Sequence, residues 1–269
     1  MALSLKVEGR VAWLVFDHGK ANEMGSQELD DFEAICDRLE TGECSTLISS
    51  SSRRSKRGTA IFIAGANVTE RVGWSRDQVA THVRRQRQVL RRVRELPLFH
   101  IAVVNGVALG WGTEYCLTAD YRIGCSESVY GLPETGLGIL PGAGGSADLW
   151  AQIGVSQALR LGMTGERIDV QEAYRIGLVQ EIQEDVGAGL ERARSLASRV
   201  AKNSPTAVAA FKQACLSAVG RPPDDRLEIE ARAYEHCLDS GEAAIGRKHF
   251  GEIRAGHVPP WGKLERFET

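Results

Sequence analysis

Two glutamates stand where a carboxylate could take part in proton transfer. Glu114 ends the stretch GWGTE, residues 110–114, which directly follows an apolar run, and Glu134 lies in VYGLPETGLGILPGAGG. If the fold brings the two together, their repulsion raises the pKa of one carboxyl group, so that the pair can serve as acid and base near neutral pH. Each residue alone has a simpler interpretation. Glu114 could match a helix dipole, and Glu134 could form a structural salt bridge.

The glycines beside Glu114 indicate how this glutamate is positioned. Gly110 and Gly112 end an apolar strand, and TEYCLTAD continues with residues compatible with a helix, so Glu114 is expected in the first helical turn. Trp111 stands between the two glycines. Its indole could line a pocket or pack against a neighbouring element, and the sequence leaves both open.

Other motifs argue against several kinds of site. PGAGG, residues 141–145, lacks the spacing and the lysine of a phosphate-binding loop, so we interpret it as a tight turn before a helix near Gly145. The chain has no G-x-S-x-G motif of a serine hydrolase. The six cysteines and six histidines show no zinc-ligand spacing, so reduced thiols and no metal site are expected.

The elements that must position these residues alternate in type. The first 17 residues predict a hairpin, and a helix with Ser26 as its N-cap follows. Strands are expected at residues 46–48 and 60–63, at FHIAVVNG and at YRIGC, with an amphipathic helix from Arg76 to Glu95 before Pro97. From Gly189 onward the pattern is almost entirely helical. This order favours an α/β layered fold with a boundary near residue 200.

Composition and charge limit the partners. The 269 residues are 43% hydrophobic and 25% charged, with a formal net charge of −2. This composition is typical of a soluble globular protein and gives no overall attraction to nucleic acid or to anionic membranes. No apolar segment approaches the ~20 residues that cross a bilayer, and the N-terminus carries charges where a signal peptide needs an uninterrupted apolar stretch. We therefore expect a cytoplasmic protein without membrane association.

Five segments, in order along the chain, resemble the crotonase family, which is also called the enoyl-CoA hydratase/isomerase superfamily. IFIAGANVTE is similar to the family's F-x-A-G-A-D stretch. HIAVVNGVALGWGTEYCLTADYRIG resembles its I-N-G-x-A-L-G-G-G-x-E segment, and YGLPETGLGILPGAGG resembles F-G-x-P-E-x-x-L-G-I-x-P-G-x-G-G. MTGERIDVQEAYRIGLVQEI and KNSPTAVAAFKQA resemble two later motifs. Five matches in the right order identify the chain as a member of the family.

The resemblance implies an α/β fold with a crotonase-like ββα superhelix core. Residues 1–200 would form the core for acyl-CoA binding and catalysis, and residues 201–269 a C-terminal helical trimerisation region. It also implies a homotrimer, or a hexamer that is a dimer of trimers. Coenzyme A would belong to the substrate, and no separate cofactor is implied.

The resemblance also assigns roles to residues. Glu114 and Glu134 fall on the two catalytic carboxylates of the family's hydratases, and the backbone N–H groups of Ala66 and Trp111 fall on its oxyanion hole. A thioester enolate concentrates charge on one oxygen, which two fixed N–H donors stabilise. The positions implied to contact CoA or the substrate are Lys20, Ala21, Ala64, Gly65, Asn67, Val68 and Gly110.

Keeping both glutamates favours an enoyl-CoA hydratase or dehydratase, which adds or removes water at the C2=C3 bond of an acyl-CoA thioester. The alternative within the superfamily is a Δ3-Δ2 enoyl-CoA isomerase or an enzyme that forms or cleaves carbon-carbon bonds. Trp111 and Asn67 replace the family's usual Gly and Asp, and GGSADLW replaces G-G-T-Q-R-L. These departures predict a specialised acyl group.

Two basic segments leave a second alternative open. RRSKR, residues 53–57, could approach the CoA phosphates, although a solvated loop is the simpler interpretation. The helix at residues 76–95 carries seven arginines. One group within the family has a similarly basic helix and binds RNA, so an RNA-binding or catalytically weak partner subunit stays an alternative. Interleaved aromatic residues and an RNA-binding motif are missing from this helix, so nucleic acid is not the expected partner.

Overall fold

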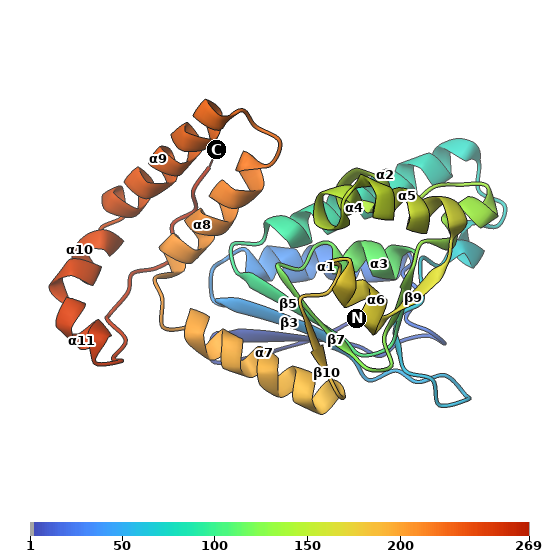
Figure 1. Ribbon diagram of the computed structural model, residues 1–269, viewed down its shortest axis with the longest axis horizontal. Helices are drawn as coiled ribbons and strands as arrows, with labels where there is room; N and C mark the ends of the chain where they lie inside the picture. Colours follow the sequence, from blue (N-terminus) through green and yellow to red (C-terminus); the bar gives the residue numbers. More distant parts are fainter. Residues whose placement is uncertain (1–2, 269) are drawn as a thin grey trace.

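Two sheets form the centre of the computed structural model, which describes residues 3–268 (Figure 1). The larger sheet has the order β1-β2-β3-β5-β7-β10. Its strands are β1 (Ser4–Glu8), β2 (Val11–Phe16), β3 (Thr46–Ser51), β5 (Phe99–Val104), β7 (Tyr121–Cys125) and β10 (Glu181–Gln183). The β1-β2 hairpin is antiparallel, and the other neighbours in this sheet are parallel.

The smaller sheet has the order β4-β6-β8-β9. Its strands are β4 (Ile61–Ile63), β6 (Val107–Leu109), β8 (Val129–Gly131) and β9 (Arg167–Asp169). The first three are parallel neighbours, and β9 pairs with β8 in the antiparallel direction. The strands β3, β5 and β7 of the larger sheet are each followed by a strand of the smaller sheet and then by a helical element. The repeated ββα order confirms the expected fold class.

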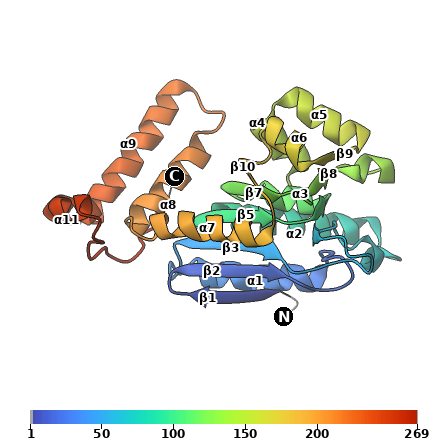
Figure 2. The ribbon, with the colours of Figure 1, turned by 60° about the horizontal axis from the view of Figure 1, so that its bottom comes forward.

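The helices cover both faces of the larger sheet because its strands alternate their side chains. Ala102 and Val104 face an apolar cluster that contains α1 (Ser26–Leu39) and α2 (Arg76–Glu95). Ile101 and Val103 face a second cluster with Ala193 and Ala197 of α7 (Val186–Val200). Successive residues of a strand point to opposite faces, so one apolar run serves both clusters. Figure 2 shows α7 lying along the larger sheet.

The remaining helices form two groups. The elements η1 (Val68–Arg71), α3 (Trp111–Cys116), η2 (Pro133–Leu137), α4 (Gly145–Ile153), α5 (Val155–Thr164) and α6 (Val170–Arg175) surround the smaller sheet. A helical lobe of α8 (Pro205–Ala218), α9 (Pro223–Asp239), α10 (Glu242–Lys248) and α11 (Phe250–Arg254) lies to one side of the sheets (Figures 1 and 2). The last segment returns along α8, where the Glu265 N–H donates to Thr206 Oγ1 at 2.9 Å. The lobe begins after α7, and the division at residue 200 into catalytic and trimerisation units stays a prediction.

Several sequence expectations about elements can now be compared with the structure. The hairpin, the helix from Arg76 to Glu95 and the helix that begins at Gly145 are confirmed. The cap assignment is wrong, since Gly25 is the N-cap of α1 and Ser26 is its first helical residue. Carboxylates satisfy the amides there instead: Gly25 donates to Glu28 Oε2 at 2.8 Å and Ser26 donates to Glu70 Oε2 at 3.0 Å. Periodicity does not reveal β9 or β10, because three residues are too few to show a period.

The six cysteines, all inside residues 3–268, form no disulfide, and four of them are buried. Within this range, no group of three or more His, Cys, Asp or Glu side chains is arranged to hold a metal ion. No helix in the described range has the length and apolar character that a membrane span requires.

Candidate active site

The carboxyl ends of three parallel strands bring the predicted residues together. Because β4, β6 and β8 are parallel neighbours, their carboxyl ends lie at one edge of the smaller sheet. The segments that follow them line a cavity of about 880 Å³. Eight of the predicted residues contribute to this lining: Ala64, Gly65, Ala66, Val68, Gly110, Trp111, Glu114 and Glu134.

The three other predicted residues lie beside the cavity and not in its lining. The Ala64 N–H donates to Ala21 O at 3.0 Å, and the side chain of Arg53 approaches Lys20 O. The Asn67 N–H donates to Met24 O at 2.8 Å, and its Oδ1 accepts from Thr69 Oγ1 at 2.6 Å. The loop of Lys20 and Ala21 therefore borders the Ala64 segment, and its contact with coenzyme A stays a prediction.

Glu114 is a buried carboxylate with a fixed orientation. Only 3% of the residue is exposed, and it lies in the first turn of α3, as the sequence predicts. Its Oε1 accepts from the Ala143 N–H at 2.7 Å and from the Gly145 N–H at 2.8 Å. Burial raises the pKa of Glu114, and these two amides act in the opposite direction. The PGAGG turn thus holds a carboxylate, a role that its sequence did not reveal.

Glu134 lies on η2, directly after β8, in a different environment. Its Oε2 is buried without a hydrogen-bond partner in the described part of the chain. Burial raises the pKa of Glu134 to about 7, its own backbone N–H opposes the rise, and the charge of Glu114 adds to it. The two glutamates therefore converge on one cavity, and one of them titrates near neutral pH.

Two backbone N–H groups border the same cavity, those of Ala66 and Trp111. No hydrogen bond connects either group to another residue in the range 3–268. The N–H groups of a first helical turn have no partner within the helix, and Trp111 is the first residue of α3. Each is preceded by a glycine with positive φ, +132° at Gly65 and +52° at Gly110. A positive φ favours glycine, and Trp111, the first residue of α3, does not have a positive φ.

The helix α3, which begins at Trp111, packs closely on β4, the strand that precedes the Ala66 segment. A Cβ added to Gly112 would lie 2.1 Å from the backbone oxygen of Ile63. A Cβ added to Gly110 would lie 2.5 Å from Glu134 Oε1. The two glycines of GWGTE therefore serve different purposes. Gly112 lets the helix reach the strand, and Gly110 leaves room for the second carboxylate.

The indole of Trp111 packs in the core. Only 2% of the residue is exposed, and its ring stacks on Tyr115 with centroids 5.8 Å apart. Phe32 of α1 lies against it at 5.7 Å. Of the two expected places, packing against a neighbouring element accounts for the indole, although the residue also contributes to the cavity lining.

The part of the lining that the sequence did not predict comes from α2, from η2 and the segment after it, and from the end of η1. Val79, Ala80 and Val83 provide apolar wall on α2, with Leu137, Ile139 and Leu140 across the cavity. Arginines also contribute, namely Arg71, Arg76, Arg84 and Arg87. Arg76, Arg84 and Arg87 belong to the basic helix that the sequence predicts, and their place beside the strand ends is a tertiary feature.

Most arginines of α2 are paired within the chain. Arg85 binds Glu33 at 2.8 Å and Arg92 binds Asp37 at 2.7 Å, so both reach carboxylates of α1. The other pairs are Arg76–Asp77, Arg91–Glu95 and Arg94–Asp148. Five of the seven arginines are therefore neutralised locally. This pairing reduces the basic surface that the RNA-binding alternative requires.

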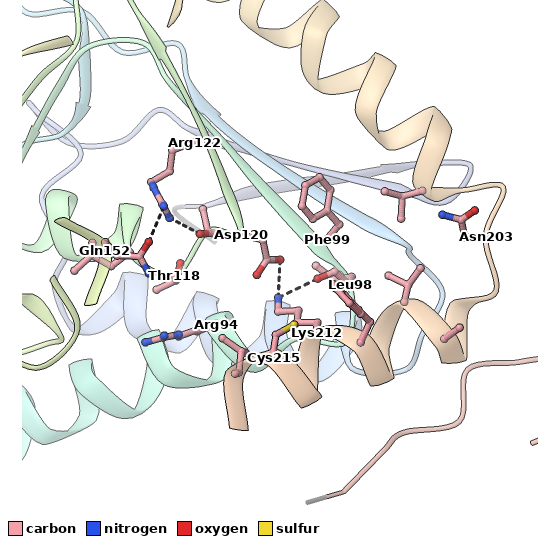
Figure 3. Close-up of a pocket in the computed structure, with 17 residues that line it drawn as sticks. Arg94, Leu98, Phe99, Thr118, Asp120, Arg122, Gln152, Asn203, Lys212 and Cys215 are labelled. Atoms are coloured by element: carbon pink, nitrogen blue, oxygen red, sulfur yellow. Dashed lines mark hydrogen bonds and ion pairs between the residues drawn. The ribbon is translucent and has the colours of Figure 1, made fainter. Parts of the chain in front are cut away.

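A second cavity, of about 640 Å³, lies between α8 and the sheets and contains none of the predicted site residues (Figure 3). Lys212 of α8 reaches across it, where its Nζ donates to Asp120 Oδ2 at 2.8 Å and to Leu98 O at 3.0 Å. Burial lowers the pKa of Lys212. This cavity lacks a pair of convergent carboxylates, and we assign it to the attachment of the helical lobe.

A sequence profile described as enoyl-CoA hydratase/isomerase matches residues 56–262. A probable enoyl-CoA hydratase of Bacillus subtilis (strain 168) is 31% identical over 94% of this chain and 96% of its own length. A short-chain-enoyl-CoA hydratase of Clostridium acetobutylicum is 31% identical over 93% of this chain and 94% of its own.

Solved structures give the same result. The crystal structure of an enoyl-CoA hydratase from Bacillus anthracis superposes with a TM-score of 0.88 at 32% identity. The superposition covers 98% of this chain and 100% of the other. The sequence match, the ββα order and the two glutamates at neighbouring strand ends agree. The chain belongs to the enoyl-CoA hydratase/isomerase family, also called the crotonase family.

Proposed function

We propose that the protein is an enoyl-CoA hydratase, which adds water to, or removes it from, the C2=C3 bond of an acyl-CoA thioester. The observation that carries the proposal is the convergence of Glu114 and Glu134 on one cavity beside the N–H groups of Ala66 and Trp111. An isomerase that moves a double bond needs one proton-transfer group, whereas hydration needs a group for water and a group for C2.

In the proposed hydration, each group has one task. Glu114, held by the amides of Ala143 and Gly145, takes a proton from water as the oxygen bonds to C3. The C2=C3 electrons move to the thioester oxygen, where the N–H groups of Ala66 and Trp111 stabilise the enolate, each by ~3 kcal/mol. Glu134 then gives its proton to C2, and transfer of the new proton from Glu114 to Glu134 restores the starting protonation state. Water is consumed, and no electrons are gained or lost.

The proposal extends to the ligand and the assembly. Coenzyme A would extend past the loop of Lys20 and Ala21, and no cofactor other than the substrate's own CoA is required. The acyl group would be a specialised one that fits the wall formed by α2. We also propose that the protein is cytoplasmic. We further propose that it forms a homotrimer or hexamer, because the helical lobe has exposed apolar residues that include Phe211 and Tyr234.

Loss of the conjugated thioester absorbance, measured with a series of enoyl-CoA thioesters, tests the activity. We expect hydration by the wild type, and a fall of about 10² or more in kcat for Glu114→Gln and for Glu134→Gln. A β,γ-unsaturated thioester serves as the control for isomerisation. Equal rates for the wild type and both variants, or conversion of the β,γ-unsaturated thioester alone, would exclude hydration as the function.

A further inference from the structure

One side of the catalytic cavity is lined by cationic groups that have no carboxylate partner. Arg71, Arg84 and Arg87 line it, and none of them forms an ion pair with a described residue. Arg84 and Arg87 are the two arginines of α2 that remain after the five pairs described above. The lining carboxylates are Glu114 and Glu134.

Arg71 is the most confined of the three. It is half-buried, its Nη2 donates to Gln86 Oε1 at 3.3 Å, and its Nε is buried without a partner in the described range. Burial lowers the pKa of Arg71, whereas the charge of Glu70 raises it. A guanidinium withdrawn from water is stabilised best by a hydrogen-bonded anion.

Nearby groups do not supply this anion directly. Glu70 Oε2 accepts from the Ser26 N–H at 3.0 Å, and Glu70 Oε1 lies 3.3 Å from His82 Nε2. Burial and the charge of Arg71 lower the pKa of His82, and the charge of Glu70 acts in the opposite direction. Gln86, which is only 3% exposed and lines the cavity, has an Nε2 without a partner in the described chain. The pair Arg71 and Gln86 thus combines a positive charge with an unused donor.

Arg87 and Arg84 follow the same wall. The Arg87 Nε donates at 3.0 Å to the backbone oxygen of Gly142, which belongs to the turn that holds Glu114, so Arg87 is engaged near this carboxylate. Arg84 lies three residues earlier on α2, about 4.5 Å along the helix axis, and its charge is unused. The apolar wall of Val79 and Val83 shares this surface.

We infer that the acyl group of the substrate ends in a carboxylate, which Arg71 and Arg84 bind. This inference rests on the proposed function and specifies its substrate class: an α,β-unsaturated acyl-CoA with a second, terminal carboxylate. An Arg fork matches a carboxylate with two parallel hydrogen bonds, and Gln86 orients the guanidinium of Arg71. The phosphates of coenzyme A are the other anions that could reach these arginines, and the experiment separates the two.

Calorimetric binding of two saturated thioesters tests the inference without catalysis. Glutaryl-CoA and 5-methylhexanoyl-CoA have the same shape, since an isopropyl group replaces the carboxylate in the second. We expect the wild type to bind glutaryl-CoA at least about tenfold more tightly. Arg71→Gln and Arg84→Gln should each reduce this preference. Arg91→Gln is the matched control, because Arg91 lies on the same helix and pairs with Glu95 outside the cavity.

The possible outcomes are distinct. Equal loss of affinity for both thioesters and for free coenzyme A in the two variants would assign the arginines to the CoA phosphates and overturn the inference. Equal or tighter binding of 5-methylhexanoyl-CoA by the wild type would also overturn it. Arg84 is exposed, so Arg84→Gln keeps the test valid if Arg71→Gln does not fold. Failure of the proposed function looks different: glutaryl-CoA binds tightly, but the protein hydrates neither the α,β-unsaturated form of glutaryl-CoA nor that of 5-methylhexanoyl-CoA.

Discussion

At the scale of single residues, the environment separates two identical side chains. Glu114 is buried and accepts two backbone hydrogen bonds, whereas Glu134 has a buried oxygen without a partner. The pKa of Glu134 is about 7 because of burial and the charge of Glu114. Near neutral pH, Glu134 can therefore give a proton, while two backbone amides hold the carboxylate of Glu114 in place.

Replacing Glu114 tests this coupling. In Glu114→Gln the neighbouring charge disappears, so the pKa of Glu134 should fall below the value of about 7. The carboxyl carbon of Glu134, followed by NMR against pH, gives the measurement. An unchanged midpoint would show that burial alone sets the pKa.

The same shift has a consequence for stability. The folded-state pKa of Glu134 lies above its ordinary value of 4.5, so between these values the folded protein binds more protons than the unfolded chain. This contribution to stability is present below about pH 4.5 and is lost as pH rises through about 7. Urea unfolding should show this loss in the wild type and a smaller one in Glu134→Gln.

The two glycines of GWGTE give a matched pair of substitutions. Gly110→Ala places a Cβ 2.5 Å from Glu134 Oε1 at a φ of +52°, so it should displace the carboxylate and lower kcat by about 10². Gly112→Ala meets the backbone oxygen of Ile63 at 2.1 Å, which a side-chain movement cannot relieve. We expect this variant to lower the Tm more than Gly110→Ala. A Gly110→Ala enzyme with the wild-type kcat would contradict the assigned role.

At the scale of elements, strand direction assembles the site. The strands β4, β6 and β8 are three residues long and stabilise little on their own, but being parallel they deliver their following segments to one edge. The helix α2 closes this edge and is held to α1 by ion pairs of Arg85 and Arg92. The position of α2 therefore decides which side chains meet the acyl group.

A buried ion pair between Lys212 and Asp120 joins α8 to the rest of the chain. In Lys212→Met, Asp120 loses its cation and keeps the His100 N–H, so unfolding should become easier by about 3 kcal/mol. The double variant Lys212→Met with Asp120→Asn should recover part of this loss. Lys6→Met is the control, because its pair with Glu8 is exposed and contributes under ~1 kcal/mol. Urea unfolding measures all three, and equal stability of Lys212→Met and Lys6→Met would contradict the role.

At the scale of the whole molecule, the helical lobe has an apolar surface that one chain leaves uncovered. The apolar residues of the lobe that are more than half exposed include Phe211 of α8, Val219 directly after α8, and Leu227 and Tyr234 of α9. Exposed apolar residues gathered on one lobe are typical of an interface. A trimer or hexamer would cover them, as the family resemblance implies.

Light scattering after gel filtration tests the assembly. We expect a mass of three or six times the 29.3 kDa of one chain. The double variant Phe211→Glu with Tyr234→Glu should lower this mass, because charges are costly in an apolar interface. Val72→Glu is the control, a similar change at a residue that is 84% exposed outside the lobe. A monomeric wild type would contradict the proposed assembly.

The sequence by itself determined the parts whose cause is local. The hairpin, α2 and the helix start at Gly145 follow from periodicity, proline and glycine, which act within a few residues. The family motifs also placed Glu114 and Glu134 after apolar strands, and the structure places them after β6 and β8.

Only the tertiary structure decided how these parts meet. It directed the indole of Trp111 toward Phe32, gave the amides of the PGAGG turn to Glu114, and paired Arg85 and Arg92 of α2 with carboxylates of α1 while it left Arg84 and Arg87 in the cavity wall. These contacts join residues that are far apart in the chain. Their geometry is set by the packing of whole elements and not by neighbouring residues, so no local pattern in the sequence encodes it.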